Sequence, residues 1–169
     1  MLTDSALIRV RRARASDSEA LERVAGASWR LAYAGVIPHA ALERMMRVRD
    51  GAWWRTAIRT ESHMLVVEVS GIVAGYATCG AARNHPAEKG EIYELYVDPI
   101  YQGMGIGEYL FEACRHQLDL RALRGLIVWA LADNNPAIEF YRRRGGRVAH
   151  KSSERFGRTL VPKVGIVWA

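Results

Sequence analysis

The feature that most constrains this fold is a strand, a glycine-rich loop and a helix in direct succession. Residues 91–97 alternate like a strand and are closed by Asp98-Pro99. Residues 102–107 are rich in glycine and open an amphipathic helix, and a buried apolar strand follows at 126–131. The first N–H groups of a helix lack backbone partners and carry partial positive charge. The loop therefore predicts an anion site of the kind that holds phosphate.

The remaining segments predict an α+β fold. Strand patterns occur at 7–13, 64–69, 72–81, 91–97, 126–131, 147–150 and 159–168. Helical patterns run from a Ser16 to Glu19 capping box to near Gly35, from Pro38 through 58 as one broken helix or two short ones, from 106, and from an Asn135-Pro136 cap to Gly145-Gly146. We expect a single domain over 1–169 with a mixed, mostly antiparallel sheet of six to seven strands and about four helices.

Composition excludes several classes of protein. Half of the 169 residues are apolar and a quarter are charged, which disfavours disorder and fibrous repeats. No apolar run approaches the ~20 residues of a spanning helix, and no signal peptide is visible. Cys79 and Cys114 have no C-x-x-C or histidine spacing, so neither a disulfide framework nor a metal site is expected. We expect a cytoplasmic protein without a membrane or metal partner.

A net charge of +6 raises the alternative of nucleic-acid binding. Its 24 basic residues form clusters at 9–14, 44–49 and 142–147, but they are otherwise dispersed among 18 acidic residues. The charge pattern therefore does not favour a nucleic-acid partner over a charged, solvated surface.

The glycine-rich loop does not match two well-known phosphate motifs. A P-loop requires a lysine at the start of the following helix, and none is present. The dinucleotide fingerprint G-x-G-x-x-G fails by one residue, because Gly103, Gly105 and Gly107 are spaced two and two and Glu108 follows.

Residues 97–107, VDPIYQGMGIG, instead resemble motif A of the GNAT superfamily of acyl-coenzyme A dependent N-acetyltransferases. The motif's core, [RQ]-x-x-G-x-[GA], corresponds here to Gln102, Gly105 and Gly107. Residues 134–141, with Asn134, Ala137, Ile138, Phe140 and Tyr141, resemble motif B. The element order resembles the family's over nearly the whole chain, although the N-terminal third matches only in outline.

The resemblance implies transfer of acetyl from acetyl-CoA to a primary amine by direct attack, in a sheet that splays between its fourth and fifth strands. A non-catalytic module that binds or senses acyl-CoA is the alternative. The resemblance places Asn134 against the pantetheine arm and Gln102 in the motif. It places the arm and the acetyl carbonyl on the backbone of Leu95, Tyr96 and Val97, and the pyrophosphate on Gly103, Met104, Gly105, Ile106, Gly107 and Glu108.

Three residues are candidates for proton transfer. By resemblance, Tyr141 donates a proton to the departing thiolate, and Glu91, eleven residues before Gln102, matches the general base of the histone acetyltransferase branch. A primary amine of pKa ~10.4 is protonated at pH 7, so a carboxylate or a water chain must take its proton. Glu91 or Glu94 would need burial or a relaying water for this role. Alternation puts these two on opposite faces unless a bulge intervenes.

The acceptor region is suggested by a W-x-x-x-Y-x-G-x-I-P stretch from Trp29 to Pro38, which resembles one in many bacterial members of the superfamily. Trp29 and Tyr33 are candidates for a substrate wall, with core packing as the alternative. The acceptor is a small-molecule or peptide amine. The apolar strand at 160–168 would suit a homodimer contact.

Overall fold

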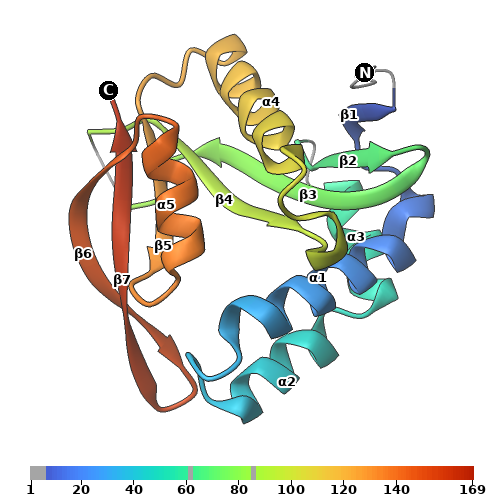
Figure 1. Cartoon of the computed structure of the whole chain (residues 1–169), viewed down its shortest axis with the longest axis horizontal. Helices are drawn as coiled ribbons and strands as arrows, with labels where there is room; N and C mark the ends of the chain where they lie inside the picture. The colour runs from blue at the N-terminus through green and yellow to red at the C-terminus, as the bar shows by residue number, and fades with distance from the viewer. Residues whose placement is uncertain (1–6, 61–62, 85–86) are drawn as a thin grey trace.

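One mixed sheet of seven strands organises the computed structural model, which describes residues 7–60, 63–84 and 87–169. The strand order is β1-β2-β3-β4-β5-β7-β6 (Figure 1), and every neighbouring pair is antiparallel except β4 and β5. The strands are β1 (Ile8–Arg12), β2 (Leu65–Val69), β3 (Ile72–Ala81), β4 (Gly90–Val97), β5 (Leu126–Leu131), β6 (Arg147–Phe156) and β7 (Thr159–Trp168). The predicted α+β class and mixed sheet are confirmed.

Helices cover both faces of this sheet. Strand residues alternate between two apolar clusters, as Leu65 and Val67 lie in one and Val66 lies in the other. The helices α4 (Ile106–Leu120) and α5 (Asn135–Arg143) pack on the first face. The second face is covered by α1 (Ser18–Tyr33), α2 (His39–Val48) and α3 (Gly51–Thr60). The sheet is therefore the middle layer of three.

The segment from 38 to 60 forms two helices, so the described residues contain five α-helices where about four were expected. The break lies at Arg49, whose φ and ψ of −91° and 61° leave the helical region. The Asp50 carboxylate then accepts a hydrogen bond from the Trp53 amide at 2.9 Å, which caps the new helix. Asp50 thus ends the connection from α2 and caps α3, which begins at Gly51.

Two of the predicted helix N-caps, at Ser16 and at Asn135, differ from those in the structure. A 3-10 turn, Ala15–Asp17, precedes α1, and the expected capping box at Ser16 is absent. The Asp17 carboxylate turns back instead, accepting hydrogen bonds from the Arg11 side chain at 2.8 and 2.9 Å and from the Arg14 amide at 2.7 Å. At α5 the cap is Asn134 rather than Asn135, since the Asn134 side chain accepts a hydrogen bond from the Ala137 amide at 3.3 Å.

Strand β6 is longer than predicted, because its pairing with β7 continues from Arg147 to Phe156 opposite Thr159. The residues at 151–155 of β6, beyond the predicted end of the strand, are polar and exposed, so they do not show the hydrophobic alternation that predicts a strand. Among the helices of the described residues, none is long and apolar enough to cross a membrane.

The buried Asp17 gives a test of this architecture. Burial opposes ionisation of Asp17, but the hydrogen bonds from Arg11 and the Arg14 amide outweigh it and lower the pKa. A lowered native pKa contributes stability above the unfolded pKa of ~4, and this contribution is lost as the pH falls through the native pKa.

We expect Asp17→Asn to lower the free energy of unfolding at pH 7 by about 1–3 kcal/mol, because Arg11 loses a charged partner. Urea unfolding from pH 7 down to pH 3 should show the difference from the parent protein shrinking below pH ~4. Glu112→Gln, which removes an exposed carboxylate on α4, is the matched control. A difference that stays constant with pH would contradict this assignment.

Candidate active site

Strands β4 and β5 diverge partway along the sheet. Their parallel pairing is limited to Gly90, Glu91 and Ile92 against residues 126–128, although β4 continues to Val97 and β5 to Leu131. Beyond Ile92, the edge of β4 that faces away from β3 has no partner strand in the described part of the chain. The backbone polar groups along this edge are therefore available to a ligand.

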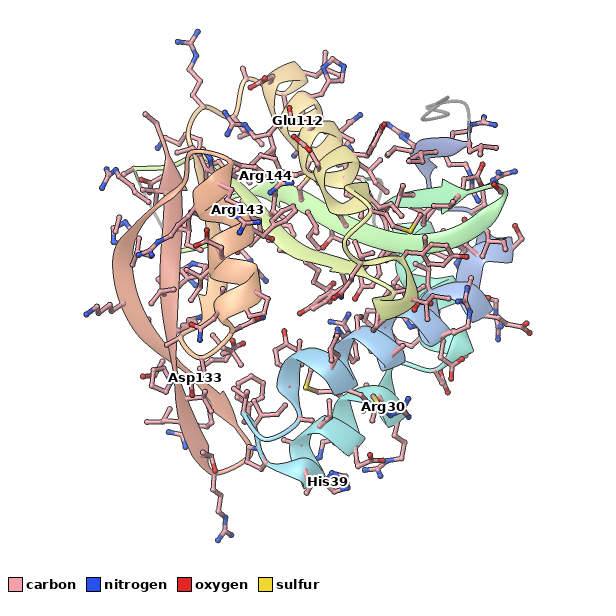
Figure 2. All side chains as sticks on the ribbon, viewed as in Figure 1. Arg30, His39, Glu112, Asp133, Arg143 and Arg144 are labelled. Atoms are coloured by element: carbon pink, nitrogen blue, oxygen red, sulfur yellow. The ribbon has the colours of Figure 1, made fainter. Side chains whose placement is uncertain are left out.

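A cleft of about 900 Å³ opens at this divergence, within the roughly 300–1,000 Å³ of ligand sites. It lies between α1, β4, the glycine-rich loop and α5; Asp133 marks the start of α5, and Arg143 and Arg144 mark its end (Figure 2). The residues from α1 and the following connection are Ser28, Leu31, Ala32, Ala34 and Val36. The opposite side is lined by Asp133, Asn134, Pro136, Ala137, Glu139, Phe140, Tyr141, Arg143 and Arg144.

The glycine-rich loop presents open backbone to the cleft. Gly103 and Gly105 have φ of 81° and 75°, a left-handed conformation that favours glycine, and a Cβ added at either would meet nothing within 4 Å. Gly105 is the N-cap of α4, and no backbone hydrogen bond from another described residue engages the amides of residues 103–105. The loop and helix start therefore have the geometry of an anion site.

Asp98 anchors this loop to the rest of the fold. Its amide donates to the Ala74 carbonyl at 2.8 Å, and its carboxylate accepts from the Ile100 amide at 3.2 Å and from Arg23 at 3.0 Å. Gln102 Nε2 adds a bond to the Val97 carbonyl at 3.1 Å. The start of the loop is thus fixed to β3 and α1 before any ligand binds.

The start of α4 and the end of α5 approach each other closely. A Cβ on Gly107 would lie 3.1 Å from the Phe140 ring, so only glycine leaves that ring undisturbed. The Arg144 guanidinium lies 3.6 Å from the same ring's centroid and 3.6 Å from the Glu108 carboxylate. The contact places a cation of the basic cluster at 142–147 beside the glycine-rich loop.

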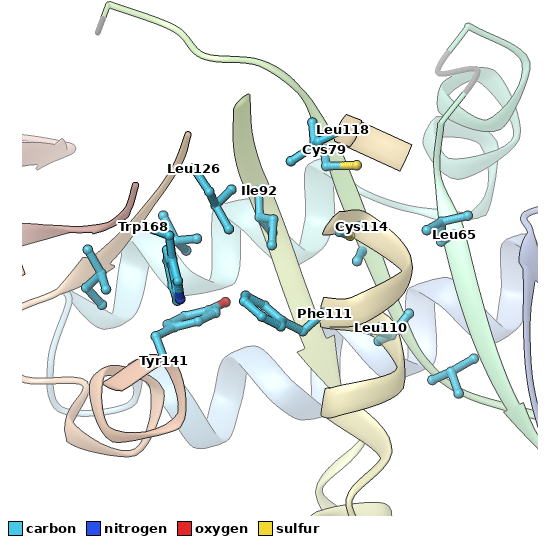
Figure 3. Packing of buried hydrophobic residues seen from close by; sticks show 14 of the residues in the cluster. Leu65, Cys79, Ile92, Leu110, Phe111, Cys114, Leu118, Leu126, Tyr141 and Trp168 are labelled. Carbon is cyan, nitrogen blue, oxygen red and sulfur yellow. The ribbon is translucent and has the colours of Figure 1, made fainter. Parts of the chain in front are cut away.

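Tyr141 lines the cleft from within an aromatic cluster. Its ring centroid lies 6.1 Å from that of Phe111 and 5.8 Å from that of Trp168 (Figure 3). The Phe140 ring centroid is 5.2 Å away. Burial raises the pKa of Tyr141 above its ordinary range, so the phenol keeps its proton at neutral pH. Its hydroxyl makes no hydrogen bond to another described residue. The hydroxyl proton is therefore available for donation to a ligand in the cleft.

A bulge in β4 changes which carboxylates share a face. Glu91 lies opposite Gly80 and Glu94 lies opposite Thr78, which leaves Tyr93 without a partner on β3. Because Gly80 and Thr78 are two residues apart, Glu91 and Glu94 lie on the same face of the sheet. Simple alternation, which separates them, is wrong here.

The structure does not bring Glu91 to the cleft. Its side chain is 2% exposed and lies where β4 and β5 are still paired. One carboxylate oxygen accepts from the Arg83 amide and the other from the Arg83 guanidinium, both at 2.9 Å. This arrangement supports a structural role in holding the chain after β3, and it argues against Glu91 as the base.

Glu94 lies beyond the divergence, next to Leu95 and Tyr96 of the cleft wall, but it does not itself line the cleft. Its Oε1 atom accepts from Arg49 at 2.6 Å and from the Tyr76 hydroxyl at 3.3 Å. The Arg49 guanidinium packs against three indole rings, 4.4–5.7 Å from their centroids, contributed by Trp29, Trp53 and Trp54. The role of Arg49 at this site could not be predicted from the sequence, because only the tertiary fold brings the end of α2 to β4.

Trp29 and Tyr33 are not among the residues that line the cleft. Trp29 is 2% exposed, and the Tyr33 hydroxyl contacts that of Tyr96 on the cleft wall. They support the wall from behind, which corresponds to the alternative of core packing. Positions 28, 31 and 32 of α1 line the cleft instead, with Ser28 buried and Leu31 exposed, and their helical spacing was the available signal.

Other predicted positions converge as a group. Every residue singled out for cofactor binding lines the cleft except Met104, which is 57% exposed. Their roles stay predictions. Within the ranges that the structure describes, no three histidine, cysteine or acidic residues are grouped to hold a metal ion.

The acetyltransferase (GNAT) family matches residues 27–146, which include the glycine-rich loop, the diverging strands and α5. The chain belongs to the GNAT family. Among curated GNAT relatives, it is 33% identical over 110 residues to the N-alpha-acetyltransferase RimI of Mycobacterium tuberculosis, covering 61% of this chain and 66% of that protein. It is 34% identical over 90 residues to an uncharacterized N-acetyltransferase of Methanocaldococcus jannaschii, covering 52% of this chain and 40% of that protein.

Solved structures share this GNAT fold. The PaiA N-acetyltransferase of Thermoplasma acidophilum, in complex with coenzyme A, has a TM-score of 0.75 at 20% identity and covers 92% of this chain and 97% of its own. A putative acetyltransferase of Salmonella typhimurium with acetyl-CoA has a TM-score of 0.67 at 19% identity. The match covers 96% of this chain and 93% of the Salmonella chain.

The Asp98 anchor gives a second prediction. We expect Asp98→Ala to lower the free energy of unfolding by about 1–3 kcal/mol, because the Ile100 amide and Arg23 both lose a buried, charged acceptor. Thermal or urea unfolding measures this effect. Asp119→Ala, at the exposed end of α4, should leave the stability nearly unchanged. Equal effects of the two substitutions would contradict the anchoring role.

Proposed function

We propose that this GNAT protein transfers an acetyl group from acetyl-CoA to the primary amine of an acceptor by direct attack. The observation that carries the proposal is the cleft between β4 and β5, which leads to the glycine-rich loop at the start of α4. An anion site and an unpaired strand edge in one cleft suit a ligand with a diphosphate at one end and amide groups along its arm.

The residues present fit coenzyme A. The open space over Gly103 and Gly105 leaves room for a diphosphate against the free amides of the loop. Arg143 and Arg144 place guanidinium groups on the α5 side of the cleft, beside the carboxylates of Glu139 and Glu108. The unpaired edge of β4 at Leu95 to Val97 would hold the amide groups of the pantetheine arm, with Asn134 opposite. The bound coenzyme A in the PaiA structure supports this use of the shared fold.

When bound, acetyl-CoA supplies an acetyl group already activated as a thioester. The backbone amides of the unpaired β4 edge are fixed in place and would stabilise negative charge on a carbonyl oxygen. Tyr141 would supply a proton to the thiolate that leaves, because burial keeps its phenol protonated. No covalent attachment to the protein is needed, and neither buried cysteine lines the cleft.

Glu94 is our candidate for accepting the acceptor's proton. Arg49 and Tyr76 hold its Oε1 atom, while no partner of Oε2 is recorded among the described residues. Oε2 can therefore accept a hydrogen bond from a water molecule that relays the proton from the amine. Neither Glu94 nor Arg49 lines the cleft itself, so the water relay is part of this proposal. Arg49 acts as a positioning residue, since it fixes the Glu94 carboxylate.

The defining experiment measures thiol release from acetyl-CoA over a panel of amines, with calorimetry of coenzyme A binding on the same protein. We expect binding together with amine-dependent thiol release. Binding without release from any amine would support the non-catalytic acyl-CoA module instead. No heat at millimolar coenzyme A would reject both functions.

Tyr141→Phe tests the proton donor. We expect kcat to fall by about 10²-fold while the affinity for coenzyme A stays within threefold, because the aromatic packing is retained and only the acid is lost. Tyr109→Phe on the exposed side of α4 is the control. A Tyr141→Phe protein with parental kcat would rule out the donor role.

Glu94→Gln and Glu91→Gln separate the two glutamates. We expect Glu94→Gln to lower kcat at least tenfold and to change the pH profile of the rate, because the proton acceptor is lost. Glu91→Gln should lower the thermal midpoint with kcat within threefold, because it weakens the Arg83 contacts away from the cleft. The reverse pattern would restore Glu91 as the base and exclude Glu94.

A further inference from the structure

A second, smaller cavity of about 340 Å³ lies outside the β4–β5 cleft. It is formed where the tip of the β6–β7 hairpin lies beside the start of α2 (Figure 1). Pro38, Met45 and Phe156 give it an apolar floor, and Arg44, Arg155 and Arg158 stand around it. We call this cavity the arginine groove.

The three arginines of the groove carry uncompensated positive charge. All three are exposed, and none of their side chains makes an ion pair or hydrogen bond to another described residue. The described residues that line the groove include no acidic side chain. Three like charges around one hollow repel each other, and guanidinium groups pair preferentially with carboxylates through parallel hydrogen bonds. The groove therefore suits an anionic ligand.

Local backbone geometry holds the groove in shape. The hairpin closes with Phe156 paired to Thr159 and with Gly157 at a φ of 61°, which a tight two-residue turn with glycine first requires. Arg155 and Arg158 flank this turn, and Arg44 projects from the regular helix α2. The arginines thus start from fixed backbone positions, which lowers the entropic cost of binding.

The arginine groove adjoins the cleft through the α1–α2 connection. Val36 lines the cleft, Pro38 lines the groove, and only the buried Ile37 separates them. The Cα atoms of Val36 and Pro38 are at most ~7.6 Å apart, so a ligand that reaches this end of the cleft needs only a short extension to enter the groove. A free amino acid cannot make this extension with its α-carboxylate, which lies only ~3 Å from its amine.

We propose that the acceptor is an acidic peptide, whose N-terminal amine enters the cleft and whose aspartate or glutamate side chains pair with the arginines of the groove. This inference rests on the proposed acetyl transfer and specifies its substrate class. The apolar floor at Met45 and Phe156 accommodates the methylene groups of those side chains.

The test compares two short peptides, one with glutamate and aspartate at positions 2–4 and one with glutamine and asparagine in their place. Calorimetry on protein saturated with coenzyme A should show the acidic peptide binding at least tenfold more tightly at low salt. The preference should weaken as salt is raised, because exposed ion pairs are screened. Glutamic acid alone, as the free amino acid, should not compete.

A triple variant, with Arg44, Arg155 and Arg158 each changed to glutamine, should lose the preference while coenzyme A affinity is unchanged. The matched control changes Arg59, Arg142 and Arg147 to glutamine, which removes the same charge from positions that line neither cavity. A parental preference in the groove variant, or an equal loss in the control, would overturn the proposal. So would equal binding of the two peptides.

Failure of this inference is distinguishable from failure of the proposed function. Acetylation of the neutral peptide as efficiently as of the acidic one would retain the transferase and reject the arginine groove as its acceptor site. Arginine-dependent binding of the acidic peptide without thiol release would overturn the acceptor assignment and limit the groove to peptide binding, whereas thiol release from another amine would still retain the transferase. Competition by free glutamic acid would overturn the peptide assignment.

Discussion

The separation of β4 from β5 is the constraint on which the rest of the site depends. A parallel pair normally continues its hydrogen bonds along both strands, yet here the ladder stops after Ile92. The strand edge beyond that point would leave amides and carbonyls without partners in an apolar interior, so it must face water or a ligand. The cleft is thus a consequence of backbone pairing. The side chains around it decide what it binds.

The fold secures both sides of this opening with charged groups. Asp98 and Arg23 tie the end of β4 to α1, while Arg144 holds the end of α5 against the start of α4. On the sheet's other face, Arg49 is enclosed by tryptophan rings and joins α2 to Glu94. A guanidinium stacked on aromatic rings keeps its charge and its planar geometry, so it can fix a carboxylate more precisely than a flexible lysine would.

Local chemistry explains why the loop, α4 and α5 could be predicted from the sequence. Glycine in the loop, an asparagine cap and a proline in the first turn act within a few residues, so their meaning survives without tertiary information. The structure argues against the Glu91 prediction for the opposite reason. Spacing placed it correctly along β4, but the bulge at Tyr93 and the arrival of Arg83 are properties of strand pairing. The contact of Arg49 with Glu94 and the burial of Trp29 likewise depend on the packing of α2 and α3, which the sequence pattern does not give.

The same distinction explains why acceptor recognition is harder to see than cofactor binding. A diphosphate can be held by backbone amides of one short segment, and that segment leaves a glycine signature. The acceptor site that we propose is built instead from side chains of segments more than a hundred residues apart, α2 and the β6–β7 turn. Charge brought together in this way cannot be read from clusters along the chain. The arginines at 44, 155 and 158 become a single feature only because the long, polar β6 carries its turn back to α2.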